Sequence, residues 1–469
     1  MNERAFPTLE SEIVLHLTPF GASTVMARPS EQVMDHRIRP TMMTHVNTTG
    51  REILLRCTGE WQSEEIGDQL LHASGQGWAA NEFQRLVRSF IDQAAEYGIL
   101  SLRNTAEKRA IAVTGSIDFA VPMHVSVELT TNCNLKCIYC YRDSSPGLTQ
   151  HMSGNELLGI LRELSGLGVR SVELTGGEPL LHPDFKEILS YCLSRFSRVA
   201  LLSNGTLIDS SVADMLASHK EVALVQIDLD GPTAEIHEAH RAVKGSFRRA
   251  QNAIRMLSNR GLALRVAMNV TKTNLREIER TASLAKGLGA RWFIYAPILD
   301  FGRGRDVDMV FSPEEMQYFA DLGPRLRDIL GDFLVYADSR TLQDILQRER
   351  NCGAGHRTMV LGPTGRLRPC PMFPDTAQAI GDLSLQSISE ALSNPIVGFF
   401  FNLIPPSPVS CGNCDKTYYC RHCLTRGFVT WSSERPDCSW AQATGLRGVL
   451  QPLGSAGSET CAGPRECSL

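Results

Sequence analysis

The stretch VSVELTTNCNLKCIYC, residues 125–140, decides the fold of this chain of 469 residues. It begins as a strand-like segment and ends in three close cysteines, Cys133, Cys137 and Cys140. Thiolates at this spacing on one tight loop can hold three corners of an iron–sulfur cube. With no fourth cysteine nearby, one iron would keep an open site for a bidentate amino-acid ligand. A zinc site completed by a distant residue is the alternative, but zinc ligands more often come as two close pairs.

Around this loop, residues 119 to about 300 alternate strand-like and helix-like segments six times. The expected strands are 125–130, 171–175, 199–203, 223–229, 263–270 and 292–296, with helices such as 154–167, 184–196 and 247–259 between them. This rhythm predicts an α/β fold with a parallel sheet and right-handed crossovers. Six units predict a partial (β/α)6 TIM-like barrel, not a closed barrel of eight strands.

Short motifs follow the next three expected strands directly. They are Gly176-Gly177-Glu178-Pro179, Ser203-Asn204-Gly205-Thr206 and Asp228-Leu229-Asp230-Gly231. Each is weak alone, and Gly176-Gly177 is also what a plain turn between strand and helix needs. Because ligands gather at the carboxyl ends of parallel strands, we expect the motifs to face one mouth together with the cysteine loop.

The cysteine loop, with Tyr139 before its last cysteine, resembles the signature of the radical S-adenosylmethionine (SAM) superfamily. The resemblance implies that a 4Fe–4S cluster binds SAM through its open iron. An external electron donor such as flavodoxin or ferredoxin would drive cleavage of SAM to methionine and a 5′-deoxyadenosyl radical. That radical would abstract a hydrogen atom from the substrate.

The resemblance also assigns SAM contacts. The expected cofactor-binding residues are Tyr139, Gly176, Gly177, Glu178, Pro179, Ser203, Asn204, Asp228 and Arg241. The Gly-Gly-Glu-Pro motif would line the methionine amino group, Ser203 and Asn204 would approach the ribose or carboxylate, and Arg241 would pair with the carboxylate. Asp228 stands where relatives often have Ser, and Arg241 is equally readable as a surface residue. The sequence identifies no catalytic side chain.

A second group of cysteines occupies the C-terminal part of the chain. It comprises Cys352, Cys370, Cys411, Cys414, Cys420, Cys423 and Cys438. Residues 359–368 are expected to form a hairpin that brings the first two together. The set resembles the SPASM extension of radical SAM enzymes, which implies two auxiliary 4Fe–4S clusters and three clusters in all. Two couples alone would suggest a zinc ribbon.

The resemblance leaves one auxiliary ligand missing. It implies that Cys411, Cys414, Cys420 and Cys438 hold one cluster, whereas Cys352, Cys370 and Cys423 hold the other. The incomplete cluster would keep an open iron, or Cys461 or Cys467 would fold back to complete it. The remaining cysteines, Cys57 and Cys192, lie in helix-like segments and are expected to be small buried apolar residues.

Residues 1 to about 105 form a cysteine-poor unit. A strand-like stretch enters a helix near residue 51, two more helices follow, and 98–100 begin a short strand. This resembles the PqqD-like domain, a winged-helix-like α+β unit that binds the leader of a precursor peptide by strand addition. A DNA-binding winged helix is the alternative, but nine Arg and no Lys against thirteen Asp and Glu give the unit no basic face.

The expected organisation is a leader-recognition domain at 1–105, the partial barrel at 119–310, a helical bridge at 311–350, a SPASM iron–sulfur domain at 351–448 and a flexible tail at 449–469. The net charge of −4 favours no nucleic-acid partner. No long apolar run suggests a membrane span, and no signal peptide is visible, so a cytoplasmic location is expected.

The leading hypothesis is a peptide maturase that binds a ribosomal precursor by its leader and forms a thioether, a carbon–carbon cross-link or a related oxidised residue. A sulfatase-maturing type of enzyme is an alternative. Pro371 counts against it, because those relatives carry an acidic residue at that position. A radical SAM enzyme for a small molecule would leave the N-terminal unit unexplained. A zinc-stapled peptide-binding protein is the non-enzymatic alternative.

Overall fold

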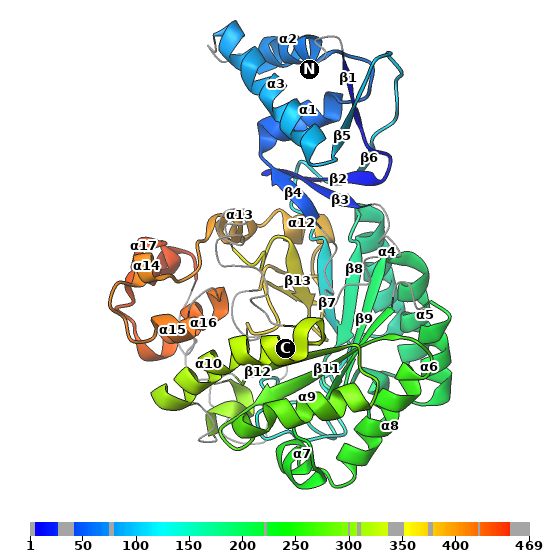
Figure 1. The fold of residues 1–469 in the computed structure, drawn as a ribbon, viewed down its shortest axis with the longest axis vertical. Coiled ribbons are helices and arrows are strands. Elements are labelled where there is room, and N and C mark those ends of the chain that lie inside the picture. Colours follow the sequence, from blue (N-terminus) through cyan, green and yellow to red (C-terminus); the bar gives the residue numbers. More distant parts are fainter. Residues whose placement is uncertain are drawn as a thin grey trace, which may run out of the picture.

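The structure is a computed structural model that describes residues 5–26, 42–74, 79–219, 223–298, 301–306, 311–335, 351–373, 379–420 and 423–450. Cys461 and Cys467 therefore lie outside the described residues, as does the tail expected at 449–469 except for its first two residues. Figure 1 shows an N-terminal unit of strands and helices, a central sheet flanked by helices, and a group of short helices that carries most of the C-terminal cysteines.

Six parallel strands form the centre of the molecule, as the alternating sequence pattern predicts. They are β7 (His124–Glu128), β8 (Ser171–Thr175), β9 (Arg198–Ser203), β10 (Ala223–Asp228), β11 (Ala263–Val270) and β12 (Trp292–Pro297). Each pairs in parallel with the next one along the chain. The strands therefore direct all their carboxyl ends, and the loops that follow, to one edge of the sheet.

Helices cover the outer face of this sheet (Figure 1). They are α4 (Gly154–Leu167), α5 (Phe185–Arg195), α6 (Ser210–Ala217), α7 (Ala234–Arg241), α8 (Ser246–Ser258) and α9 (Ile278–Gly287), with short turns η1 (Pro179–Leu181) and η2 (Leu275–Glu277). Helix α4 shows how local sequence fixes their ends. Ser153 and Glu156 form a capping box at its start, and Gly168 ends it in the left-handed conformation.

The predicted C-terminal hairpin forms, and it also extends the central sheet. Strand β13 (Thr358–Leu361) pairs with β14 (Arg366–Arg368) antiparallel and with β7 in parallel, and β14 pairs with β15 (Gly381–Asp382). The sheet therefore has nine described strands, in the order β12-β11-β10-β9-β8-β7-β13-β14-β15. The hairpin that precedes Cys370 thus lies beside the strand that precedes Cys133.

The N-terminal unit combines two small sheets with three helices. Its elements are β1 (Phe6–Leu9), β2 (Ile13–Thr18), β3 (Gly21–Met26), β4 (Met42–Val46), α1 (Thr48–Arg56), α2 (Ser63–Ser74), α3 (Ala80–Glu96) and β5 (Leu100–Arg103). The three helices and the strands β4 and β5 occur where the sequence predicts them, whereas β1, β2 and β3 are additional. Strand β6 (Ala112–Gly115) pairs with β2, so the sheet of this unit takes in residues beyond 105.

The C-terminal region consists mainly of short segments, some of which pack on the central core, whereas those from residue 408 onward contribute to a separate aromatic core. The segments are η3 (Gly302–Asp306), α10 (Pro313–Leu330), η4 (Gly331–Phe333), α12 (Ile388–Leu392), α13 (Pro395–Asn402), α14 (Pro408–Cys411), α15 (Thr417–Cys420), α16 (Leu424–Val429), η5 (Thr430–Glu434), α17 (Ser439–Ala443) and η6 (Leu446–Gly448). The aromatic core includes Phe373, Phe400, Phe428 and Trp440.

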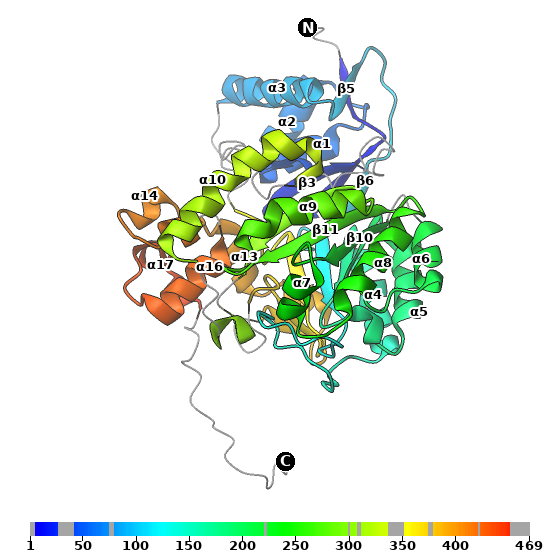
Figure 2. The ribbon, with the colours of Figure 1, turned by 60° about the horizontal axis from the view of Figure 1, so that its bottom comes forward.

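The N-terminal unit is seated at the amino ends of the central strands (Figures 1 and 2). Arg170, just before β8, donates a hydrogen bond to the carbonyl oxygen of Met26 at 3.1 Å, and the His16 ring lies 2.8 Å from the carbonyl oxygen of Val121, just before β7. The Phe20 ring stacks on Phe401 of α13 with centroids 4.0 Å apart. This end is opposite to the edge where the cysteine loop follows β7.

Candidate active site

The three-cysteine loop begins five residues after β7 and is packed into the mouth of the sheet. Cys133 and Cys137 are buried and Cys140 is half-buried. Protein donors already approach two of the sulfurs. The Leu135 N–H lies 3.4 Å from Cys133 Sγ, and Arg241 Nη1 lies 3.7 Å from Cys137 Sγ. Donors directed at thiolates are what a cluster site requires, so the loop fits a 4Fe–4S cluster.

Burial makes the free thiols of this loop reluctant to ionise. It raises the pKa of Cys133 to about 12 and that of Cys137 to about 11, although the Arg241 charge opposes the rise at Cys137. A buried thiolate needs a compensating cation. Iron bound by these sulfurs would supply that charge, because metal binding drives deprotonation of cysteine ligands.

The two glycines after β8 let that loop pack against the backbone that leads into the cysteine loop. A Cβ atom on Gly176 would lie 2.7 Å from the carbonyl oxygen of Thr130, and one on Gly177 would lie 2.1 Å from that of Asn132. The φ angle of Gly176 is 126°, where side chains are strained. The two glycines therefore allow a close backbone contact, which places the loop after β8 beside Cys133.

The Glu178 carboxylate lies at the centre of this contact and is fully buried. It accepts hydrogen bonds from the Ser203 hydroxyl and the Asn204 N–H, both at 2.9 Å. Burial raises the pKa of Glu178 to about 7 despite these donors. In this structure Glu178 joins the loops after β8 and β9, so we assign it a positioning role beside the expected SAM site.

Asn204 connects the loop after β9 to the cysteine loop. Its amide nitrogen donates to Asn134 Oδ1 at 2.9 Å and lies 3.9 Å from Cys133 Sγ. Its amide oxygen accepts from the backbone N–H and the hydroxyl of Thr206. The structure thus brings Asn204 to the cysteine loop, while the neighbouring Ser203 donates to Glu178.

A charged cluster under the loop contains three of the expected cofactor-binding residues and Asp230, which belongs to the sequence motif after β10 but was not among those expected contacts. Arg241, buried at the end of α7, pairs with Asp230 at 2.6 Å and with Asp228 at 3.3 Å. The Tyr139 hydroxyl donates to Asp230 at 2.5 Å. Burial and Asp230 raise the pKa of Asp228, whereas Arg241 lowers the pKa of Asp230 against its burial.

Arg241 is therefore not a surface residue. Its guanidinium stands between the Cys137 sulfur and two carboxylates. Asp230 was not among the expected cofactor contacts. It lies two residues after Asp228, the last residue of β10, and its place in the motif that follows this strand was the available signal.

Arg303 in η3 is a second site residue that no sequence motif indicated. It donates to the carbonyl oxygens of Cys137 at 2.8 Å and Ser144 at 2.7 Å, and its backbone N–H donates to that of Cys140. The arginine thus holds both ends of the cysteine loop. Nothing near it in sequence indicated this, because the contact spans more than 150 residues.

The seven C-terminal cysteines fall into two electrostatic neighbourhoods. Burial raises the pKa of Cys370 to about 12 and that of Cys420 to about 11. Negative charge on Cys423 and Cys352 also raises the pKa of Cys370. Negative charge on Cys438, Cys411 and Cys414 also raises the pKa of Cys420. In addition, the Thr425 hydroxyl and the Met372 N–H each lie 3.4 Å from Cys370 Sγ.

These neighbourhoods match the division into three and four cysteines that the SPASM resemblance implies. Among the described residues, no three His, Cys, Asp or Glu side chains are arranged to hold a single metal ion. Thiolates that each bind a different iron of a cube do not have to converge on one point. The grouping and the donors at Cys370 therefore fit auxiliary clusters.

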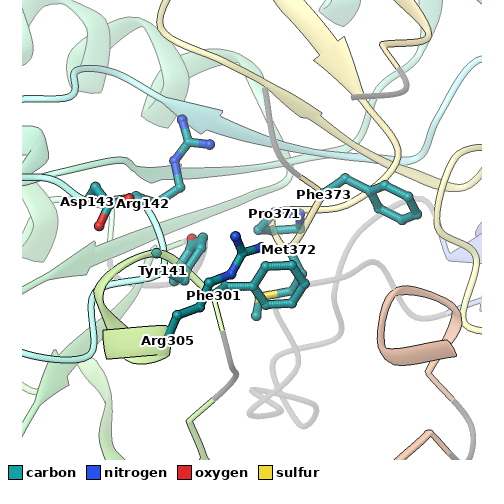
Figure 3. A pocket seen from close by; sticks show the side chains of 9 residues that line it. Tyr141, Arg142, Asp143, Phe301, Arg305, Pro371, Met372 and Phe373 are labelled. Atoms are coloured by element: carbon teal, nitrogen blue, oxygen red, sulfur yellow. The ribbon is translucent and has the colours of Figure 1, made fainter. Parts of the chain in front are cut away.

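A cavity of about 360 Å³ lies between the two cysteine regions (Figure 3). One wall comes from the residues that follow Cys140, and the opposite wall comes from those that follow Cys370. The lining residues are Tyr141, Arg142, Asp143, Phe301, Gly302, Arg305, Pro371, Met372 and Phe373. The lining combines aromatic and apolar side chains with two arginines, Arg142 and Arg305.

Comparisons with known proteins agree with this geometry. The Radical SAM superfamily model matches residues 127–285. The chain is 30% identical over 454 residues to the antilisterial bacteriocin subtilosin biosynthesis protein AlbA of Bacillus subtilis (strain 168), covering 96% of this chain and 99% of AlbA. It is 31% identical over 194 residues to the sporulation killing factor maturation protein SkfB of the same organism, covering 41% of this chain and 47% of SkfB.

The fold also resembles a solved structure along most of its length. SuiB of Streptococcus suis bound to its precursor peptide SuiA superposes with a TM-score of 0.61 at 15% identity, covering 90% of this chain and 96% of SuiB. This likeness establishes the partial barrel with its flanking N- and C-terminal units. Within the described part of the chain, no helix has the length and apolarity needed to cross a membrane.

Proposed function

The chain belongs to the radical SAM superfamily, and from that premise we propose that it is a maturase that cross-links a ribosomally made precursor peptide. The single observation that carries the proposal is the likeness to AlbA, which extends over nearly the full length of both chains. It covers the barrel, the N-terminal unit and the cysteine-rich region together. SuiB, whose fold this chain shares, has been solved with its precursor peptide.

The enzyme uses SAM and a 4Fe–4S cluster, and we assign the cluster to Cys133, Cys137 and Cys140. When bound, these groups supply a carbon radical that removes a hydrogen atom from the substrate. The chain's own residues position that chemistry. Arg241 places a positive charge beside the Cys137 sulfur. Arg303 donates a hydrogen bond to the Cys137 carbonyl oxygen and so fixes the backbone of the loop.

Burial of the cysteine loop at the carboxyl ends of the strands also excludes water from the site. Cys133 and Cys137 are each 8% exposed, and they cluster with Leu135 and Tyr139 of the same loop, against which Val243 and Ile298 pack. Exclusion of water protects a reactive radical from side reactions. The cavity beside Tyr141 and Pro371 would then present the peptide core to the loop.

We further propose two auxiliary clusters. One is held by Cys411, Cys414, Cys420 and Cys438, and the other by Cys352, Cys370 and Cys423. The grouping of their charges supports the division. Anaerobically reconstituted protein should then hold about twelve iron atoms per chain, and about eight after loss of one auxiliary site. About four irons in the intact protein would contradict the proposal.

The N-terminal unit supplies an edge for the leader of the precursor. Among the described strands, β4 and β6 are the two edges of the order β4-β3-β2-β6, and β6 lies against Gly168 at the end of α4. An unpaired strand edge binds an extended peptide through main-chain hydrogen bonds. We therefore place the leader along β4.

The test compares Cys137→Ala with Cys192→Ala in the full chain. Cys192 is buried in α5, away from the three cysteines, so its substitution controls for the loss of a barrel thiol. With SAM, a reductant and the precursor peptide, Cys137→Ala should form neither 5′-deoxyadenosine nor modified peptide. The Cys192→Ala variant should form both. SAM cleavage by Cys137→Ala would overturn the assignment.

A further inference from the structure

Glu128, the last residue of β7, carries a buried carboxylate that is bound by two buried arginines. Arg142 Nη2 lies 2.7 Å from Glu128 Oε2, and Arg368 Nη2 donates to the same oxygen. The side chain of Glu128 is 1% exposed, that of Arg142 9% and that of Arg368 0%. Arg368 also donates through Nη1 to the carbonyl oxygen of Phe373.

The two arginines come from the two cysteine regions. Arg142 lies two residues after Cys140, and Arg368 lies two residues before Cys370. Glu128 itself belongs to the strand that enters the first cysteine loop. One carboxylate oxygen therefore connects the end of the first loop to the start of the second.

A triad of this kind is an unusual choice for a protein core. Two guanidinium groups and one carboxylate are held in a place with almost no water, where each charge costs desolvation free energy. Apolar side chains of the same volume would commonly stabilise the fold at least as well. What the triad adds is geometry, because planar guanidinium groups fix both the distance and the direction of their partners.

The geometry that it fixes is that of the cavity between the loops (Figure 3). Arg142 lines one wall of that cavity and Phe373 lines the opposite one. Arg142 is bound to Glu128, and Phe373 is bound to Glu128 through Arg368. The pairing of β13 with β7 brings the two walls side by side, and the triad sets their separation.

We propose that Glu128 is a positioning residue that sets the separation of the first cysteine loop from the Cys370 loop, and with it the width of the cavity that takes the peptide core. The part that concerns the peptide rests on the proposed function. A wider cavity lets the substrate move away from the radical. SAM cleavage then continues while fewer cleavages end in a modified peptide.

The first readout needs no cofactor. Hydrogen–deuterium exchange is measured on metal-free protein for segments 133–144 and 358–373. Glu128→Gln should raise exchange at least fivefold in both segments, because one acceptor holds both. Arg366→Gln is the matched control. It lies on the same strand as Arg368, but its side chain is 45% exposed and its Nε lies 3.7 Å from Asp382 Oδ2, so its substitution should leave both segments unchanged. A rise confined to one segment would refute the proposal that Glu128 holds both segments.

The second readout is the amount of modified peptide formed per 5′-deoxyadenosine in reconstituted protein. It should fall at least tenfold in Glu128→Gln at unchanged iron content, and stay at the wild-type value in Arg366→Gln. An unchanged ratio in Glu128→Gln would overturn the proposal. If the wild-type enzyme modifies no peptide, the proposed function fails. The exchange experiment still shows whether Glu128 holds the two segments together.

If Glu128→Gln does not fold, Arg368→Lys takes its place. A lysine keeps the charge but replaces the planar fork, whose two terminal nitrogens bind Glu128 and the Phe373 carbonyl separately, with a single ammonium group. It should raise exchange in both segments at least twofold and lower the product ratio. Wild-type values for Arg368→Lys would contradict the role of the triad.

Discussion

Gly177 has no room for a side chain, because a Cβ atom there would lie 2.1 Å from the Asn132 carbonyl oxygen. Gly177→Ala should therefore force the β8 loop away from the first cysteine. We expect a loss of about 1–3 kcal/mol in the free energy of unfolding, as for other overpacked sites, together with lower iron content.

Gly159→Ala is the control for that substitution. Gly159 lies inside α4, where an added Cβ atom would have nothing within 4 Å of it. Alanine in a helix interior should stabilise the protein by about 0.5–1 kcal/mol. Thermal unfolding of metal-free protein and iron analysis compare the two. Equal behaviour of both variants would contradict the close-contact explanation of the glycine pair.

Glu178 should make stability depend on pH. Burial raises its pKa in the folded protein to about 7 from 4.5, so the folded state binds the proton more tightly. The free energy of unfolding therefore falls as the pH rises from about 4.5 to about 7, by up to about 3 kcal/mol. Glu178→Gln removes this contribution.

The measurement is denaturant unfolding of wild-type and Glu178→Gln protein, both metal-free, across this pH range. The difference between the two isolates Glu178, because other groups contribute to both. Buried His237, whose pKa burial lowers to about 3, is one such group. Parallel stability curves would show that Glu178 is ionised equally in the folded and unfolded states.

For single residues, the sequence predicted which side chains lie near the cysteine loop, but not which of them form ion pairs or hydrogen bonds with one another. Asn204 and Arg241 do lie at the cysteine loop. The sequence could not predict that Arg241 is bound by Asp230, or that Glu128 is shared by two arginines. Those pairings depend on side-chain geometry between segments up to 240 residues apart.

Among the secondary-structure elements, β4 provides the sharpest test of leader binding. The Thr44 N–H donates to the Thr24 hydroxyl, so the main-chain groups of Thr44 face β3. Main-chain groups alternate in direction along a strand, so the His45 N–H points away from β3. His45→Pro removes this donor while fitting an edge strand.

We expect His45→Pro to weaken leader binding at least tenfold in a fluorescence anisotropy titration. His45→Val is the matched control, because it also removes the imidazole but keeps the N–H and favours a strand. It should bind the leader within about twofold of wild type. Equal weakening by both substitutions would place the leader elsewhere.

Elements with strong periodicity were predictable, and the others were not. Helix α3 buries Phe83, Val87, Ile91 and Ala94 at helical spacing and forms as predicted. By contrast, β2 and β3 are buried on nearly every residue, so they carry no alternating pattern. The hairpin of β13 and β14 was predicted from its turn, but its pairing with β7 is a long-range contact that no local pattern encodes.

For the whole molecule, the position of the N-terminal unit limits the substrate. The unit contacts Arg170 and Val121 at the amino ends of the strands, whereas the cysteine loop lies at the carboxyl ends. The six residues of β9 span about 20 Å. A precursor bound at both places therefore needs at least about six extended residues between its leader segment and the modified residue.

Precursors with spacers of different lengths test this limit. Deleting the spacer to below about six residues should stop modification while the leader still binds with its normal affinity. Inserting Gly-Ser residues should be tolerated, because added flexible length costs little. Mass spectrometry follows the product. Full modification of the shortened precursor would mean that leader and core do not bind at opposite ends of the barrel.

The most direct test of the central claim is to follow a hydrogen atom from the peptide to the cofactor. Reconstituted enzyme is given SAM, a reductant and a precursor peptide that carries deuterium throughout its core. We predict 5′-deoxyadenosine that contains deuterium, and a peptide that has lost two hydrogen isotopes for each cross-link. Deuterium-free 5′-deoxyadenosine together with a peptide of unchanged mass would contradict the account.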